Sequence, residues 1–122
     1  MRKFAVILFI VICSNCSSQN LKNYQWKNRL VILVGDKNDS VIKEQLKLLT
    51  SLQNELDERQ IKVLHSNHGI RKELNLNPKF VGLILIGKDG GIKLKKPYVV
   101  QPGSLFSLID GMPMRRAELK NK

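Results

Sequence analysis

The sequence has little cysteine, and none where a folded domain would use it. Its two cysteines, Cys13 and Cys16, both lie close to the N-terminus. The body of the protein from Leu21 onward therefore has no thiol that could act as a nucleophile, a redox centre or a zinc ligand. A cysteine-based reaction is excluded unless the N-terminal segment supplies the thiol.

Acidic and aromatic residues are also scarce. Ten aspartates and glutamates stand against 21 lysines and arginines, for a formal charge of +11, and aromatics make up only 6%. Such an excess can steer a protein toward nucleic acid, anionic lipid or acidic polysaccharide. The basic residues are scattered along the chain, and no block interleaves them with aromatics, which argues against specific nucleic-acid binding. An anionic component of the cell envelope, or another protein, is the partner that we expect.

The first 18 residues have the order of an export signal. Residues 1–3 are basic at two positions, residues 4–12 are apolar, and residues 13–18 are small or polar. An apolar run of that length is too short to span a bilayer. We therefore expect an exported protein, located in the periplasm, on the outer membrane as a lipoprotein, or outside the cell.

Two cysteines are candidates for lipid attachment. Cys16 is followed by two serines and resembles the modified residue of a bacterial lipoprotein, although the residues before it depart from the usual small apolar pattern. Cys13, directly after the apolar run, is the other candidate. A lipid on either cysteine would bind the protein to a membrane.

Residues 82–96 predict a β-hairpin. The unbroken apolar run 83–86 is typical of a strand covered on both faces, and residues 88–91 (KDGG) allow a tight reversal. Residues 92–95 alternate apolar and basic, which predicts a half-exposed strand with lysines toward water. Its lysines would keep the protein soluble and protect a sheet edge; the alternative is an anion-binding stripe. The lysines concerned are Lys88, Lys93, Lys95 and Lys96.

The other periodicities predict one α/β domain. The apolar run at residues 30–34 predicts a first strand, and a second strand is expected at residues 61–65 (IKVLH). An apolar stripe over residues 42–56 predicts one helix, and a short helix is expected at about residues 70–76. The resulting order is β-α-β-α-β-β-α, a small mixed sheet with helices on both faces and a thioredoxin-like architecture. Its first two strands should be parallel and its last two antiparallel.

The predicted domain organisation has three parts. Residues 1–18 form the export signal, residues 19–28 are a linker leading into the domain, and residues 29–122 form the thioredoxin-like domain. Trp26, the single tryptophan, is expected to pack over the edge of this domain.

The C-terminal segment contains the candidate site. Pro113 should break the last helix, because it has no N–H and its ring crowds the preceding turn. Asp110 precedes Arg115 and Arg116 by five and six residues, and a break could bring them together. We expect an ion pair that locks the terminal helix. The alternative is an anion-binding patch made of Lys88, Arg115 and Arg116.

No cofactor or metal is expected. His65 and His68 form an HxxH pair, but no cysteine or paired carboxylate lies near them in sequence to complete a metal site. The glycines of residues 87–91 belong to a strand-to-strand turn, so no helix N-terminus is available there for a phosphate. Asp39 or Ser40 is expected to cap the first helix.

Several segments resemble the prokaryotic DUDES family, short exported domains related to a repeated domain of animal extracellular-matrix proteins. The most specific are residues 87–93 (GKDGGIK) and 109–116 (IDGMPMRR), and residues 56–59 (LDER) with Trp26 and Arg29 also fit. The resemblance covers roughly residues 26–118. It implies a thioredoxin-like fold and no established activity.

The sequence departs from active thioredoxins at one decisive place. Redox cysteines would lie between the first strand and the first helix, where this chain has residues 36–40 (DKNDS). We therefore expect a non-redox binding or assembly module of the cell envelope. The alternative is a thiol or peroxide oxidoreductase with an atypical active site.

Overall fold

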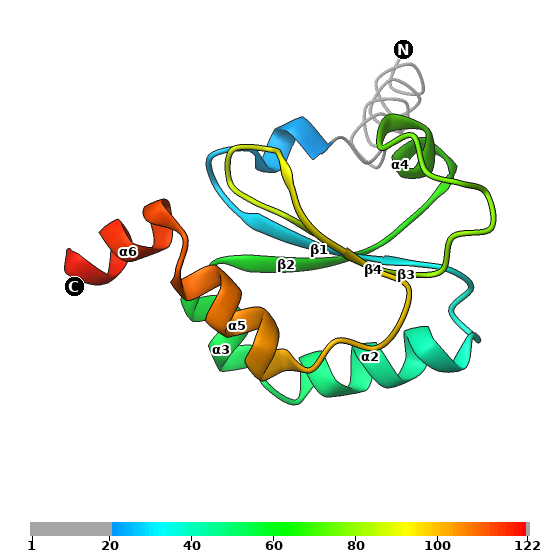
Figure 1. Ribbon diagram of the computed structural model, residues 1–122, viewed down its shortest axis with the longest axis horizontal. Helices are drawn as coiled ribbons and strands as arrows, with labels where there is room; N and C mark the ends of the chain where they lie inside the picture. The colour runs from blue at the N-terminus through cyan, green and yellow to red at the C-terminus, as the bar shows by residue number, and fades with distance from the viewer. Residues whose placement is uncertain (1–20, 122) are drawn as a thin grey trace, which may run out of the picture.

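The computed structural model describes residues 21–121, and the predicted export signal with Cys13 and Cys16 lies outside them. A four-stranded sheet with the order β2–β1–β3–β4 forms the centre (Figure 1). Its strands are β1 (Arg29–Val34), β2 (Ile61–His65), β3 (Gly82–Ile86) and β4 (Ile92–Lys96). β1 pairs parallel with β2 and antiparallel with β3, and β3 pairs antiparallel with β4. The predicted strand directions and mixed sheet are confirmed.

Helices cover both faces of the sheet, as predicted (Figure 1). On one face lie α2 (Ser40–Thr50), α3 (Gln53–Glu58) and α5 (Pro102–Asp110), which pack against alternate residues of the strands such as Val31 and Leu85. On the other face lie the 3-10 helix η1 (Leu21–Tyr24) and α4 (His68–Glu73), which contribute Leu21 and Ile70 to a second core. Both inner strands are buried along their whole length, because each of their faces meets a helix layer.

The single helix expected over residues 42–56 is two helices, so this prediction was wrong in detail. Asp39 caps α2 by accepting a hydrogen bond from the Val41 N–H. Of the two residues proposed as the cap, it is therefore Asp39 that fills this role. At the other end, the hydroxyls of Thr50 and Ser51 bond to carbonyls of the preceding turn. Such back-bonding competes with helix continuation, and the chain restarts as α3 with Leu52 left 38% exposed.

The short helix α4 begins and ends earlier than expected. Asn67 caps it by accepting from the Ile70 N–H at 2.8 Å. Asn75 adopts a left-handed conformation with φ 55°, which ends the helical turn before Leu76. The asparagine residues on either side, rather than the apolar periodicity alone, set its bounds.

Strand β4 is an edge strand, but its predicted alternation is wrong. The pairing with β3 shifts between Leu85 and Ile86, so Lys93 is an extra residue in β4. Residues paired across a sheet share a face, so Leu94 lies on the α5 face with Leu85 and Ile92 on the opposite face with Ile86. A bulge therefore divides the two apolar residues that were expected to share one face.

Trp26 does not pack over the domain, which corrects another expectation. Its backbone has φ 69° and its side chain is 62% exposed. The backbone is held instead, because the Trp26 N–H donates to the Lys88 carbonyl at 2.6 Å. Fixing the chain through this bond leaves the indole outside the core.

The last helical segment is broken at the predicted place. α5 ends at Asp110, and α6 (Pro113–Lys120) starts with Pro113 in its first turn. Figure 1 shows α6 projecting from the end of α5 beside the sheet. Within residues 21–121, no helix combines the length and apolar character needed to cross a membrane.

Candidate functional site

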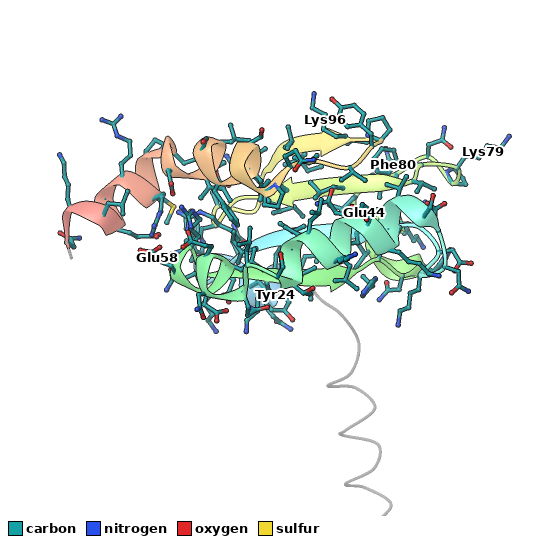
Figure 2. All side chains as sticks on the ribbon, turned by 90° about the horizontal axis from the view of Figure 1, so that it is seen from below. Tyr24, Glu44, Glu58, Lys79, Phe80 and Lys96 are labelled. Carbon is teal, nitrogen blue, oxygen red and sulfur yellow. The ribbon has the colours of Figure 1, made fainter. Side chains whose placement is uncertain are left out.

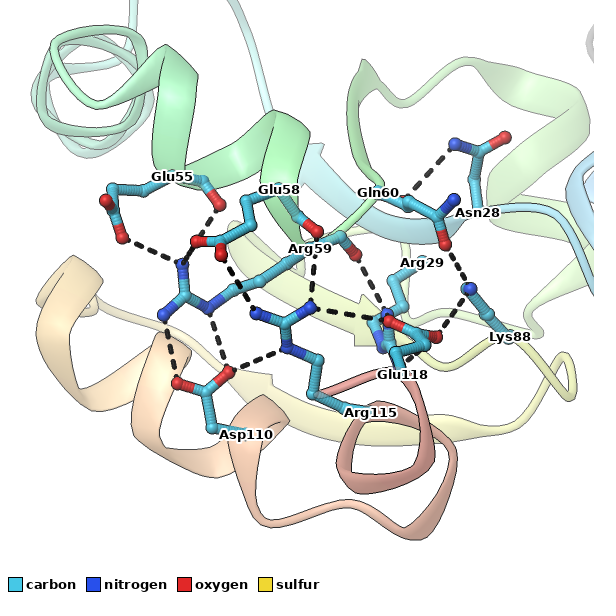
Figure 3. A network of polar contacts seen from close by, with 10 residues as sticks. All are labelled: Asn28, Arg29, Glu55, Glu58, Arg59, Gln60, Lys88, Asp110, Arg115 and Glu118. Atoms are coloured by element: carbon cyan, nitrogen blue, oxygen red, sulfur yellow. Dashed lines mark hydrogen bonds and ion pairs between the residues drawn. The ribbon is translucent and has the colours of Figure 1, made fainter. Parts of the chain in front are cut away.

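Charged side chains from distant parts of the chain meet at one end of the sheet (Figure 3). Arg29 is the first residue of β1, and Lys88 lies just beyond β3, which runs antiparallel to β1. The ends of α3 and α5 and the whole of α6 surround them. The resulting ion-pair cluster consists of Arg29, Glu55, Glu58, Arg59, Lys88, Asp110, Arg115 and Glu118.

Asp110 bridges two arginines. Its carboxylate accepts from Arg59 Nε at 3.0 Å and Nη2 at 2.9 Å, which makes a bidentate pair, and from Arg115 Nε at 3.1 Å. The guanidinium carbon of Arg59 also lies 4.4 Å from the centre of the Phe106 ring, a stacking contact that fixes its orientation. The expected contact between Asp110 and Arg115 is therefore present, but the bidentate partner is Arg59.

Glu118 is the second centre of the cluster. It lies 3.2 Å from Arg29 Nη2, 2.6 Å from Lys88 Nζ and 3.5 Å from Arg115 Nη1. Gln60 also accepts a hydrogen bond from the Lys88 ammonium. Lys88 is only 9% exposed, so the prediction that it is a solvated edge lysine was wrong; the turn directs it inward to Glu118.

The cluster satisfies its own charges. It contains four cations and four carboxylates. Arg29 and Arg115 are only 1% and 2% exposed, and buried charges are retained in proteins when they are paired and hydrogen-bonded. Arg116 is exposed. The proposed anion patch of Lys88, Arg115 and Arg116 is thus not assembled as one surface.

The cluster fastens α6 to the rest of the domain. Arg115 is the buried residue of α6, while its apolar residues Met114 and Leu119 are 39% and 42% exposed. Arg115 also donates to the Glu58 carbonyl at 3.3 Å, which connects α6 to the end of α3. Charge pairing, rather than apolar burial, therefore holds this helix in place.

The ion pairs lower the pKa values of Asp110 and Glu118. The hydrogen bond from Arg59 is the main cause that lowers the pKa of Asp110 below its ordinary value. Burial alone would raise the pKa of Glu118, but the bonds from Lys88 and Arg29 outweigh it and the pKa is lowered. For Arg59, burial opposes the charge, yet bonds to Asp110 and Glu55 raise its pKa. All these groups are charged at neutral pH.

We expect the protein to lose stability as the pH falls below about 5. Because the folded pKa values of Asp110 and Glu118 lie below the unfolded ones, their stabilisation is complete above the unfolded pKa. It is lost as the pH drops through the folded pKa. Thermal melts between pH 7 and pH 2 measure this loss. Asp110→Asn should melt lower at pH 7 and show a shallower decline; a decline equal to that of the wild type would contradict the assignment.

Sequence reasoning missed Arg59 and Glu118, which hold the centre of the cluster. They lie 51 and 8 residues from Asp110, and only the folded chain brings Arg59 beside it. A signal existed, because residues 56–59 and the region up to residue 118 were part of the family resemblance. No role could be attached to them without knowing which helix ends adjoin.

The segment between β1 and α2, where a thioredoxin carries its cysteines, has only local structural bonds. Asp36 accepts from the Asn38 N–H and Asp39 from the Val41 N–H, both at 2.9 Å. Ser40 begins α2 and is not its cap. The segment follows the end of β1 opposite to Arg29, so it is remote from the ion-pair cluster along that strand. These contacts make a turn and a cap, with no nucleophile.

The histidine pair does not assemble a metal site. His65 ends β2, and its buried Nδ1 has no hydrogen-bond partner among the described residues, while His68 begins α4 and is exposed. Across residues 21–121, no three histidine, cysteine or carboxylate side chains are grouped as metal ligands.

A family model described as "Domain of unknown function (DUF4174)" matches residues 20–68 and 64–118. The chain belongs to this family. The matched region of the DUF4174 chain includes all four strands, the KDGG turn and the ion-pair cluster. No curated protein matches the sequence.

The DUF4174 chain also resembles a solved structure, the reduced 2-Cys peroxiredoxin of Plasmodium vivax. The two chains are 13% identical, and the match has a TM-score of 0.59 and covers 83% of this chain and 85% of the other. At that identity the likeness concerns the fold alone. It confirms the predicted thioredoxin-like architecture.

Proposed function

We propose that this DUF4174 protein is a non-redox binding or assembly module of the cell envelope. One observation carries the proposal: the position of the thioredoxin cysteines is occupied by a turn and a helix cap. The carboxylates of Asp36 and Asp39 accept hydrogen bonds from backbone N–H groups. The chain therefore has a thioredoxin-like fold without a thiol nucleophile at this position.

The ion-pair cluster has a structural part in this proposal. Its cations already face carboxylates, so an incoming anion would have to displace Asp110 or Glu118 from buried arginines. Breaking such pairs costs several kcal/mol, roughly 3–5 when a buried partner is left alone. The cluster serves to lock α6, and the surface that meets a partner lies elsewhere.

Assays of insulin reduction and peroxide consumption test the absence of redox chemistry. We expect the full chain to give rates equal to the blank, because residues 21–121 contain no thiol. The matched control is the Cys13→Ser/Cys16→Ser variant. Turnover in the wild type that disappears in this variant would instead establish the competing oxidoreductase, with a cysteine supplied by the N-terminal segment.

Export through residues 1–18 and the relationship to the DUDES family belong to the same proposal. Their support is the order of charged, apolar and small residues, and the motifs GKDGG and IDGMPMRR. Intact mass of the protein from its native membrane fraction is the test of export. We expect loss of the leader, with an added lipid if Cys16 or Cys13 is modified. An unprocessed chain starting at Met1 in the cytosol would contradict export.

A further inference from the structure

A groove lies between the edge strand β4 and helix α5. It has a volume of about 340 Å³, and its lining is mainly apolar with a few polar residues. Tyr98 and Leu108 line it and are 54% and 41% exposed. Its lining residues are Leu94, Lys96, Tyr98, Val99, Val100, Gln101, Ser104 and Leu108. Apolar side chains left this open in a hollow are typical of a binding surface.

The groove runs along an open sheet edge. In the described part of the chain β4 pairs with β3 alone, so its other side has no strand beside it. Figure 2 shows Lys96 at this outer margin of the structure. An edge strand presents backbone N–H and C=O groups that another extended segment can pair with. Backbone pairing and an apolar hollow thus lie next to each other.

The strand edge beside the groove carries charge of one sign. Lys95 and Lys96 belong to β4, and their ammonium groups lie 4.9 Å and 5.9 Å from the ring centres of Phe80 and Tyr98. None of the residues that line the groove is acidic. The lysines therefore repel a second copy of this strand, which carries the same charges, and favour an acidic segment.

We propose that β4 and this groove bind an extended, acidic segment of a partner protein, which adds a strand to the sheet and places an apolar side chain in the groove. This inference rests on the proposed binding function and names its partner class. Alternate residues of an added strand point to the same face. Lys95 pairs with Ile84 and lies over Phe80, on the face opposite the groove. Acidic residues of the added strand can then meet Lys95 while the apolar residues that alternate with them meet Leu108.

Fluorescence anisotropy with labelled peptides tests the proposal on the full chain. The probes are eight-residue peptides that alternate glutamate with valine, isoleucine, leucine or phenylalanine. We expect at least one to bind saturably and to weaken in high salt. Each binder is then made in two versions, with N-methyl groups on the odd or on the even residues. A strand pairs with its neighbour through alternate residues, so one version should lose binding and the other keep it.

Two sets of variants separate the groove from general charge. Lys95→Gln/Lys96→Gln and Tyr98→Ala/Leu108→Ala should each weaken binding about tenfold. The control Lys43→Gln/Lys47→Gln removes the same charge from exposed positions on α2 and should change little. Thermal melts confirm that each variant is folded.

Four results would overturn the proposal. The first is that no peptide binds up to millimolar concentration, and the second is that both N-methylated versions bind equally. The third is that the α2 control weakens binding as much as the β4 variant does. The fourth is that the protein binds phosphatidylglycerol vesicles through Lys95 and Lys96 but binds no peptide. These results leave the non-redox assignment intact, because that assignment stands or falls on the separate turnover assays.

Discussion

Arg115→Ala is expected to destabilise the domain strongly, whereas Arg116→Ala should leave its stability nearly unchanged. Arg115 is 2% exposed and contacts Asp110, Glu58 and Glu118. Removing the Arg115 side chain leaves its carboxylate partners facing one another and leaves a void under the first turn of α6. The cost should be roughly 2–3 kcal/mol, below the upper range for buried pairs because its partners are partly exposed. That corresponds to a fall in Tm of roughly 10 °C or more.

Arg116 is the matched control, because it carries the same side chain on the same helix and is exposed. Its removal should cost under about 0.5 kcal/mol. Asp110→Ala should resemble Arg115→Ala, since it removes a carboxylate partner from both Arg59 and Arg115. Thermal melts at pH 7 measure all three, with salt-dependent binding to an acidic glycan alongside. Unchanged melts with lost binding in the arginine variants would instead support an anion-recognition patch.

The fold was predictable because its signals are local. The two inner strands are continuous apolar runs, and the KDGG turn fixes an antiparallel hairpin within a few residues. Pro113 likewise marks the break between α5 and α6 by its own chemistry. Where local rules competed, prediction failed: hydroxyl back-bonding by Thr50 and Ser51 ended a helix whose apolar stripe continues. The bulge at Lys93 was also invisible, because register depends on the partner strand.

The candidate site was predictable only in part, for a related reason. Asp110 and Arg115 are close in sequence, so a helix break was enough to suggest their contact. Arg59 reaches Asp110 from the end of α3, and Glu118 reaches Lys88 from α6. Such pairs depend on how α3, α5 and α6 meet at one end of the sheet. The lysine pattern indicated exposure correctly for Lys95 on β4 and wrongly for Lys88 in the turn before it.

The position of the cluster bears on how the domain could bind a partner. α6 is held by ion pairs at the end of the sheet, while the groove beside β4 is formed by α5 and the strand edge. The cluster keeps α5 and α6 in a fixed relation through Asp110, which ends α5 and pairs with Arg115 of α6. A rigid α5 keeps Leu108 in place over the groove, and preformed sites bind with less loss of entropy.

Gly82→Ala is expected to have the other large effect, because it separates β4 from the sheet. A Cβ at Gly82 would lie 2.0 Å from the Lys96 carbonyl oxygen and 2.8 Å from Pro97 Cα. Both are backbone atoms, so they cannot rotate away as a flexible side chain would. The start of β3 or the end of β4 must move, and the pairing of Leu83 with Lys96 is lost. We expect a cost of roughly 3 kcal/mol or more.

Gly103→Ala is the matched control for this close approach. A Cβ there meets no atom within 4 Å, and the residue lies in α5. The substitution should leave Tm unchanged or raise it slightly, because alanine favours a helix over glycine by up to about 0.5–1 kcal/mol. Thermal melts measure both variants, and hydrogen exchange at residues 92–96 reports the edge strand directly. Gly82→Ala should accelerate exchange of the β4 amides that bond to β3, and acidic peptides should lose their binding site with the strand. A Gly82→Ala protein that melts like the wild type and keeps slow exchange in β4 would contradict the prediction, because it would show that the added Cβ is accommodated with the two strands still paired.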